Sequence, residues 1–180
     1  MKNGNKNLLC MVYSAVCIAL GMILPLFLGQ VQIFMQGISP MHIPALLCGL
    51  ACGPWWGLAV GFISPLLRSL IFSMPPMATA IPMAFELAVY GVVAGLLFMM
   101  LKKMNFWPRT YVSMIAAMLI GRCVGGAAKA VVMGINGEGY GFTAFLSAYF
   151  VGTAAGAVLH LIVVPLILYA LYRAKLLPND

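Results

Sequence analysis

The sequence predicts an all-α integral membrane protein with six transmembrane helices and both termini in the cytoplasm. Composition is the first observation behind this prediction: of 180 residues, 64% are hydrophobic and 7% charged, where soluble domains carry about 25% charged residues. The second is a mean hydropathy of +1.07. The third is that the apolar residues form runs close to the ~20 residues that a bilayer-spanning helix needs.

Six apolar segments meet or approach this length. They are Leu8–Leu28, Met41–Gly53, Trp55–Phe72, Met77–Leu101, Tyr111–Met133 and Thr143–Tyr172. The stretches between them reach only about a dozen residues, too few for a soluble domain. We therefore expect residues 1–180 to form a single six-helix membrane domain.

The first two segments need separate justification. Lys2 and Lys6 precede the first, as in a signal peptide, but its apolar run is too long and no small-residue cleavage site follows, so we expect it to remain. The second has roughly 13 residues, or ~20 Å of helix, and is predicted to tilt little or to begin within the preceding loop. The Gly53-Pro54 pair separates it from the third.

The basic residues predict the orientation. With six spans, the termini and the loop between spans four and five lie on one side of the membrane. These places hold seven of the ten basic residues: Lys2, Lys6, Lys102, Lys103, Arg109, Arg173 and Lys175. The opposite loops hold none, and one of them carries Glu138. Because basic loops stay inside, both termini are predicted to be cytoplasmic.

Several function classes fit the composition poorly. The net charge of +7 is not gathered into a soluble patch, so nucleic acid is not the expected partner. The five cysteines lie in apolar runs, where free cysteine is a common small buried residue, so no metal site is expected. No HExxH, GxSxG or paired acids occur, and Gly121–Lys129 matches a phosphate loop only faintly. We expect neither an enzyme nor a bound cofactor.

Small residues recur four apart along the predicted helices. The pairs are Ala15/Ala19, Gly49/Gly53, Gly57/Gly61, Gly91/Gly95, Gly121/Gly125 and Gly152/Gly156. Such pairs let helix backbones approach closely. Together they predict a compact bundle, or surfaces that receive a partner helix.

Four charged residues remain inside the predicted spans: Arg68, Glu86, Arg122 and Lys129. Each costs about 2.5–3.5 kcal/mol at mid-membrane and so needs a partner or water. At about 1.5 Å per residue, Arg68 lies about 6 Å and Glu86 about 13 Å from the outer ends of their spans. Arg122 lies about 16 Å from its outer end, with Lys129 two turns above it. The charges therefore gather in the outer half of the bundle.

These charges have a structural and a functional interpretation. Glu86 and Arg122, at similar depth, could form an internal ion pair or contact a ligand. Arg68 and Lys129 then lack an acidic partner, which favours a site for an anionic or carbonyl-rich ligand, although either could instead snorkel to the surface.

Other polar residues could complete an outward-facing site. Tyr90 follows Glu86 by one turn, and His42 could close one side of the mouth. Asn136 and Tyr140 lie in the NGEGYG loop, which could be a lid or a flexible turn. His160 is placed deeper, toward the cytoplasm, and is interpreted as a packing or partner-facing residue.

The run from Met41 to Leu97 resembles the substrate-binding S-components of energy-coupling factor (ECF) vitamin importers, in the branch assigned to pyridoxine-related compounds or pantothenate. The segments that carry the resemblance are HIPALLCG, PLLRSL, MPP and MAFELAVYG. The rest of the chain agrees in length, six-span layout and termini. Ser73 departs from the pattern, since glycine is expected before MPP.

The resemblance implies a substrate-binding subunit of the prokaryotic plasma membrane that captures a micronutrient from outside. It implies partnership with a transmembrane coupling subunit, which docks on an AxxxA motif matched by Ala15 and Ala19, and with two cytoplasmic ATPases. The loops after spans one, three and five would shape the pocket. The ligand stays open: positive charge in the cavity favours pantothenate, whereas the motifs favour a pyridoxine-type compound.

Two other classes remain compatible with the sequence. A solitary small-solute permease would need no ATPase partner. A non-transporting membrane protein, such as a scaffold, would bind no ligand tightly, and replacing Arg68 would harm its folding rather than binding.

Overall fold

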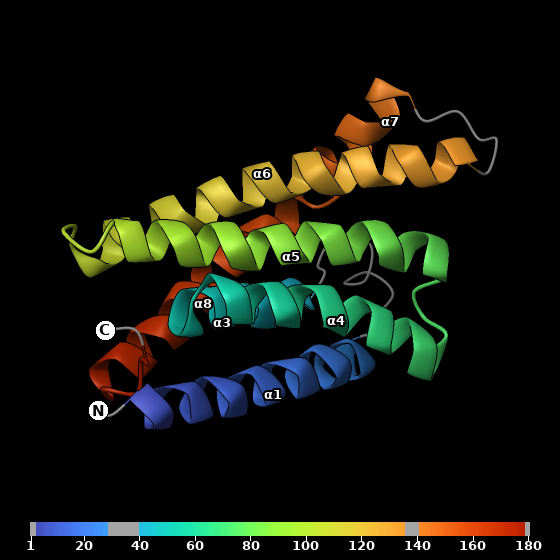
Figure 1. The fold of residues 1–180 in the computed structure, drawn as a ribbon. Helices are drawn as coiled ribbons and strands as arrows, with labels where there is room; N and C mark the ends of the chain where they lie inside the picture. Colours follow the sequence, from blue (N-terminus) through green and yellow to red (C-terminus); the bar gives the residue numbers. More distant parts are fainter. Residues whose placement is uncertain (1–2, 29–39, 136–140, 179–180) are drawn as a thin grey trace.

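A computed structural model describes residues 3–28, 40–135 and 141–178, and these residues form helices and no strand. The elements in chain order are α1 (Asn3–Leu28), α3 (His42–Cys52), α4 (Pro54–Phe72), α5 (Met77–Met100), α6 (Phe106–Ile135), α7 (Phe142–Leu146), the π-helix η1 (Ser147–Val151) and α8 (Ala154–Arg173). Figure 1 shows them as an elongated bundle whose long helices run side by side. The predicted all-α class is confirmed.

The described helices suit a membrane. Five stretches are long and apolar enough to cross it, with Phe142–Arg173 counted as one, and α3 is a shorter apolar helix of 11 residues. The two termini lie at the same end of the bundle (Figure 1), as an even number of crossings requires. Which side of the membrane that end faces stays a prediction.

The short helix α3 occupies the centre of the bundle. All 11 of its residues are buried, and it packs against α1, α4, α5 and α8. A helix that is apolar on every face is stable only where other helices surround it. Gly53, with φ of 102°, makes the sharp turn into α4, and Pro54 takes the first helical position, where its missing N–H costs nothing.

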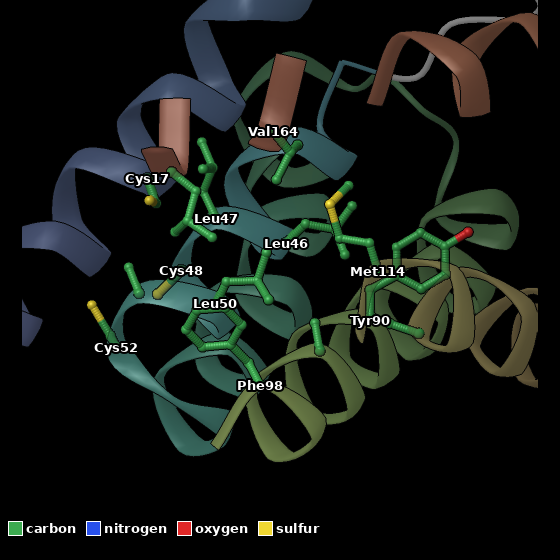
Figure 2. Packing of buried hydrophobic residues seen from close by; sticks show 14 of the residues in the cluster. Cys17, Leu46, Leu47, Cys48, Leu50, Cys52, Tyr90, Phe98, Met114 and Val164 are labelled. Atoms are coloured by element: carbon green, nitrogen blue, oxygen red, sulfur yellow. The ribbon is translucent and has the colours of Figure 1, made fainter. Parts of the chain in front are cut away.

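The core extends from α3 to every long helix. Figure 2 shows Leu46, Leu50 and Phe98 in this cluster, with Met114 and Val164 reaching it from α6 and α8. Four cysteines, Cys10, Cys17, Cys48 and Cys52, are buried between α1 and α3 as free thiols. No group of metal-ligating side chains occurs within the described residues.

Glycines set the distance between α3, α4 and α5. The backbones of Gly49, Gly57 and Gly91 touch, and a Cβ on Gly57 would lie 2.7 Å from the Gly49 Cα. A Cβ on Gly95 would lie 2.6 Å from the Pro54 nitrogen. The predicted role of the small residues in compact packing is confirmed for this three-helix contact, since any side chain there would separate the backbones.

Arg109 differs from its predicted position in a cytoplasmic loop. Helix α6 begins at Phe106, earlier than predicted, so Arg109 lies in its first turn and is buried. Its Nε donates to the Phe98 carbonyl at 2.6 Å, and its guanidinium lies 3.6 Å from the centroid of the Phe98 ring. The last carbonyls of α5 have no partner within their own helix, and Arg109 supplies one.

The sixth predicted span contains an interruption. The Gly152 N–H donates to the Ser147 carbonyl, five residues back, and residues 152–153 form a turn before α8 begins. The Thr153 hydroxyl donates to the Tyr149 carbonyl at 2.6 Å, a side-chain bond that competes with regular helix bonding. No residue of α7 or η1 is buried, and α7 stands off the end of the bundle opposite the termini (Figure 1).

Ser73 ends α4 in the left-handed conformation, with φ of 55° and ψ of 17°. This conformation costs a residue with a Cβ roughly 1–2 kcal/mol, and glycine adopts it freely. The departure from the expected glycine therefore falls at a position where glycine would be favoured.

Replacing Gly91 with alanine is expected to destabilise the protein. The added methyl would meet the Gly57 backbone, 2.7 Å from its Cα, and forced overpacking costs about 1–3 kcal/mol. Thermal unfolding in detergent measures the loss. Gly134→Ala is the matched control, because nothing lies within 4 Å of a Cβ there and alanine in a helix gains about 0.5–1 kcal/mol. Equal melting temperatures for the two variants would contradict the packing argument.

Candidate binding site between α3, α5, α6 and α8

Polar side chains from four helices converge inside the bundle. His42 comes from α3, Glu86 and Tyr90 from α5, Arg122 from α6 and His160 from α8. They line one cavity together with Thr153 and Gly156. The five polar side chains from the helices have exposed fractions between 1% and 9%. Buried polar groups in an apolar bundle are costly, so a cluster of them is a candidate functional site.

Glu86 is the acceptor on which this cluster centres. The Tyr90 hydroxyl, one turn along α5, donates to Glu86 Oε1 at 2.9 Å. His42 Nε2 lies 3.5 Å from the same oxygen and makes an ion pair with it when protonated. The carboxylate is thus held by one partner on its own helix and one on α3.

Tyr90 joins the site to the apolar core. Its ring belongs to the buried hydrophobic cluster, and Figure 2 shows its hydroxyl pointing away from the labelled apolar side chains. A tyrosine suits this boundary because its ring packs with apolar groups while its hydroxyl needs a polar partner.

The two histidine rings lie beside each other. The His42 and His160 centroids are 5.4 Å apart with an interplanar angle of 24°, and the His42 ring is tilted against Tyr90 at 5.2 Å. Three aromatic rings from α3, α5 and α8 therefore form one wall of the cavity. Such a wall offers stacking surface together with ring nitrogens that donate or accept hydrogen bonds.

Glycines on α6 make room for the α5 side chains. The Tyr90 ring fills the space where Gly121 lacks a side chain, and a Cβ on Gly125 would lie 2.8 Å from the Glu86 Cβ. The predicted Gly121/Gly125 pair therefore accommodates site residues. This close approach also brings Arg122 beside α5.

Arg122 links α6 to α8 and η1. Its Nη2 donates to the Thr153 carbonyl at 3.4 Å, and its guanidinium lies 5.7 Å from the Phe150 ring centroid. It also lines the same cavity as Glu86 and Tyr90. The ion pair found at Glu86 among the described residues is made with His42, so a direct Glu86–Arg122 pair stays a prediction.

The cavity between these residues is small. About 10 Å³ is open to the centre of a water molecule, roughly the space of one water. Pockets that hold small organic ligands measure about 300–1,000 Å³. The space between these described side chains is therefore too small for a ligand of vitamin size unless the groups around it move apart.

Arg68 lies elsewhere in the bundle. Its Nη1 donates to the Met22 carbonyl of α1 at 2.9 Å, and its guanidinium lies 5.7 Å from the Phe72 ring centroid. It does not line the cavity around Glu86. Arg68 therefore makes a buried contact that joins α4 to α1. Its contact with a ligand stays a prediction.

The remaining predicted site residues have mixed placements. Lys129 is partly exposed on α6 beyond Arg122 and does not line the cavity. Asn136 and Tyr140 lie outside the described residues. The cavity therefore brings together His42, Glu86, Tyr90 and Arg122 from the predicted set.

His160 was not among the predicted site residues and was interpreted as a packing or partner-facing residue. It lines the cavity with His42 and Glu86, while its depth in the membrane stays a prediction. The usable signal was the residue itself, since a lone histidine in an otherwise apolar span is a functional candidate by default. Thr153 contributes a backbone carbonyl, for which the sequence holds no signal.

Ala15 and Ala19 lie on the exposed side of α1. The same side carries Met11, Val12 and Val16, which are also exposed. This face packs on no other described helix, so lipid or a partner helix can reach it.

A protein-family model described as "ECF transporter, substrate-specific component" matches residues 10–175 of the chain. Comparisons with curated proteins and with solved structures gave no match.

Replacing Tyr90 with phenylalanine tests the hydrogen bond at the centre of the cluster. Losing the donation to Glu86 is expected to lower the free energy of unfolding by about 1 kcal/mol, measured by thermal unfolding in detergent. Tyr111→Phe is the matched control, because that ring is 37% exposed and stacks on Trp107. A loss no larger for Tyr90→Phe than for this control would show that the Tyr90–Glu86 bond contributes little.

Proposed function

Because the chain belongs to the substrate-specific components of ECF transporters, we propose that it captures a small water-soluble vitamin or cofactor precursor in the cavity around Glu86. Members of this family are membrane-embedded transport subunits rather than enzymes, and they work with a transmembrane coupling subunit and ATPases. In this proposal the chain lies in a prokaryotic plasma membrane, the cavity faces outward and partner ATPases supply the energy. The observation that carries the proposal is the convergence of five buried polar side chains from four helices.

The cavity chemistry favours one of the two ligand types left open by the sequence. Among the described residues that line it, the fixed charges are one carboxylate, Glu86, and one guanidinium, Arg122, so this part of the cavity is not strongly positive. Arg68, the second cation expected there, contacts Met22 instead. A ligand carboxylate would meet Arg122 but would also lie near Glu86, and like charges close together repel. This balance disfavours pantothenate.

A pyridoxine-type ligand fits the same groups better. A flat heteroaromatic ring can stack on the His42/His160 wall, since aromatic rings favour offset stacking. Its hydroxyls can donate to Glu86 and accept from Arg122, and its ring nitrogen can bond with an imidazole. In this assignment Glu86 and Arg122 fix orientation, the histidines bind the ring and Tyr90 holds Glu86 in place.

The exposed face of α1 is proposed as the docking surface for the coupling subunit. Ala15 and Ala19 are four residues apart and both exposed, so a second helix can approach the α1 backbone closely. Larger neighbours flank them, including Val12 and Val16. Two small residues within a wider apolar face provide a shallow groove for a partner helix.

Ligand binding is measured with purified protein, using tryptophan fluorescence and thermal shift against pyridoxine, pantothenate and a wider vitamin panel. We expect pyridoxine or a close relative to bind, and Glu86→Gln and His160→Ala to weaken binding about tenfold or more, since each removes a polar contact worth about 1.4 kcal/mol or more. No binding by any compound would contradict the proposal. Selective binding of pantothenate would overturn the ligand assignment alone.

The Arg68→Ala variant forms a separate arm of this measurement. Loss of binding in a folded protein would support the sequence-based prediction that Arg68 contacts ligand. Retained binding with a lowered melting temperature would assign Arg68 to the α4–α1 contact with Met22.

The double variant Ala15→Leu, Ala19→Leu tests the docking surface. It is expected to bind ligand like the unmodified protein, because both side chains point away from the bundle, but to lose association with the coupling subunit. Co-purification and ATP-driven uptake in liposomes measure this. Val16→Leu, a large-for-large change on the same face, is the control and should retain both activities. Unimpaired uptake by the double variant would place docking elsewhere.

A further inference from the structure

The chain reverses direction where α8 ends. The Lys175 N–H donates to the Tyr172 carbonyl and the Leu176 N–H to the Leu171 carbonyl, both at 3.0 Å. These are the two hydrogen bonds of a Schellman motif, which ends a helix by turning the chain back. Residues 174–178, named the C-terminal hook from here on, therefore leave α8 in a defined direction.

The C-terminal hook is attached to the bundle at two points. The Tyr13 hydroxyl of α1 donates to the Leu176 carbonyl at 3.1 Å, and Leu177 belongs to the buried apolar core. Figure 1 shows the end of α8 near the start of α1, at the end of the bundle that holds both termini. The backbone that carries Lys175 is therefore held in place by α1 and by the core.

Lys175 has an uncommon backbone conformation for a lysine. Its φ is 58°, in the left-handed region that glycine adopts freely and that is costly for a residue with a Cβ. Glycine is also the usual residue at this position of a Schellman motif. The turn by itself does not require lysine, and a side chain kept in a costly conformation motivates a hypothesis of function.

Arg173 and Lys175 line the same hollow, which measures about 510 Å³. Tyr172 and Leu177 complete the described part of its lining, and both cations are exposed. Glu86 is the one acid among the described residues, and it lies in the middle of α5 rather than here. The last carbonyls of α8, which would repel an anion, accept hydrogen bonds from the hook. The described lining therefore favours an anionic group.

Aromatic rings surround this end of α8. The Tyr172 ring stacks on Phe106 at 4.8 Å, and the Trp107 ring stacks on Tyr169 at 5.0 Å, centroid to centroid. Tyr172 is 42% and Trp107 40% exposed. Tyrosine and tryptophan side chains gather where a membrane protein passes from hydrocarbon to water. The hollow beside Tyr172 thus has the surroundings expected at the level of lipid headgroups.

An exposed apolar strip runs along α8 to the hollow. Ile162 and Leu166 are 55% and 56% exposed, and Ala170 is exposed as well. Residues three or four apart lie on one face of a helix, so these side chains form a strip with Arg173 at its end. An acyl chain can lie along this strip while a phosphate reaches Arg173. A soluble anion would leave the strip unused.

We propose that the hollow binds the headgroup of an anionic phospholipid, with its phosphate on Arg173 and Lys175 and an acyl chain along α8. A guanidinium suits a phosphate because it can donate two parallel hydrogen bonds, and the lysine adds a second charge. This end of the bundle is predicted to be cytoplasmic, and the cytoplasmic leaflet is the one rich in anionic lipids. The inference goes beyond the proposed function and does not rest on it, because it needs no ligand at Glu86.

Native mass spectrometry of purified, delipidated protein measures lipid binding. Phosphatidylglycerol and phosphatidylcholine with the same acyl chains are compared, and we expect phosphatidylglycerol to bind about tenfold more tightly. The double variant Arg173→Gln, Lys175→Gln should lose this preference, since each basic residue near a membrane surface contributes about fivefold in affinity. A preference retained by this variant would overturn the site.

The matched control is the double variant Lys102→Gln, Lys103→Gln. It removes the same charge from exposed residues in the turn between α5 and α6, at the same end of the bundle (Figure 1). We expect it to keep the preference for phosphatidylglycerol. An equal loss in both double variants would show a general attraction to surface charge and would overturn a site at the hook.

Lys175→Gly separates lipid binding from the stability of the hook. Glycine adopts the left-handed conformation without cost, so the melting temperature of the lipid-free protein should not fall. The affinity for phosphatidylglycerol should fall about fivefold, because one charge is lost. A lower melting temperature with unchanged lipid affinity would assign Lys175 a structural role and contradict the proposal.

Soluble glycerol phosphate identifies the source of the phosphate, because it carries the headgroup chemistry without acyl chains. Added at the concentration of phosphatidylglycerol, it is expected to leave the bound lipid in place. Displacement of the lipid at equal concentration would show that the hollow is a site for soluble phosphates and would overturn the lipid assignment.

Discussion

The interior of this bundle has to supply polar partners for one buried carboxylate, that of Glu86. It lies in the middle of α5, almost completely buried, where an ionised group without partners would be too costly to keep. Tyr90 and His42 meet this need from α5 and α3. Arg122 of α6 lines the same cavity, and the His42 ring lies beside the His160 ring of α8. Polar residues from four helices therefore lie around one acidic group.

Glycines allow those four helices to come close enough. Between membrane helices there is little hydrophobic driving force, so close packing and hydrogen bonds hold the bundle together. The contact of Gly49, Gly57 and Gly91 draws α3, α4 and α5 together. Gly121 and Gly125 do the same for α5 and α6, with the difference that the space they leave is filled by Tyr90 and Glu86. Glycines therefore bring the backbones together on one side of α5 and make room for the polar side chains on the other.

The bundle divides into a rigid and a loosely packed part. Around α3 every long helix contributes to one apolar core, and close-packed protein interiors resist deformation. The α7–η1 segment contributes no buried residue. The polar cavity lies between helices of the packed core, and Thr153, at the junction of η1 and α8, also lines it.

The sequence by itself determined the all-helical membrane class, the number and approximate limits of the apolar segments, and the family resemblance in the first half of the chain, because these follow from runs of neighbouring residues and from local motifs. It also indicated Glu86, Arg122, Tyr90 and His42, since polar groups within apolar spans are rare. Only the tertiary structure decided which of them meet. The way each helix is rotated about its axis decides that Arg68 donates to the Met22 carbonyl and Arg122 to the Thr153 carbonyl. The packing of α8 on α3 placed His160 beside His42. These outcomes depend on contacts between distant segments, and a local pattern does not encode them.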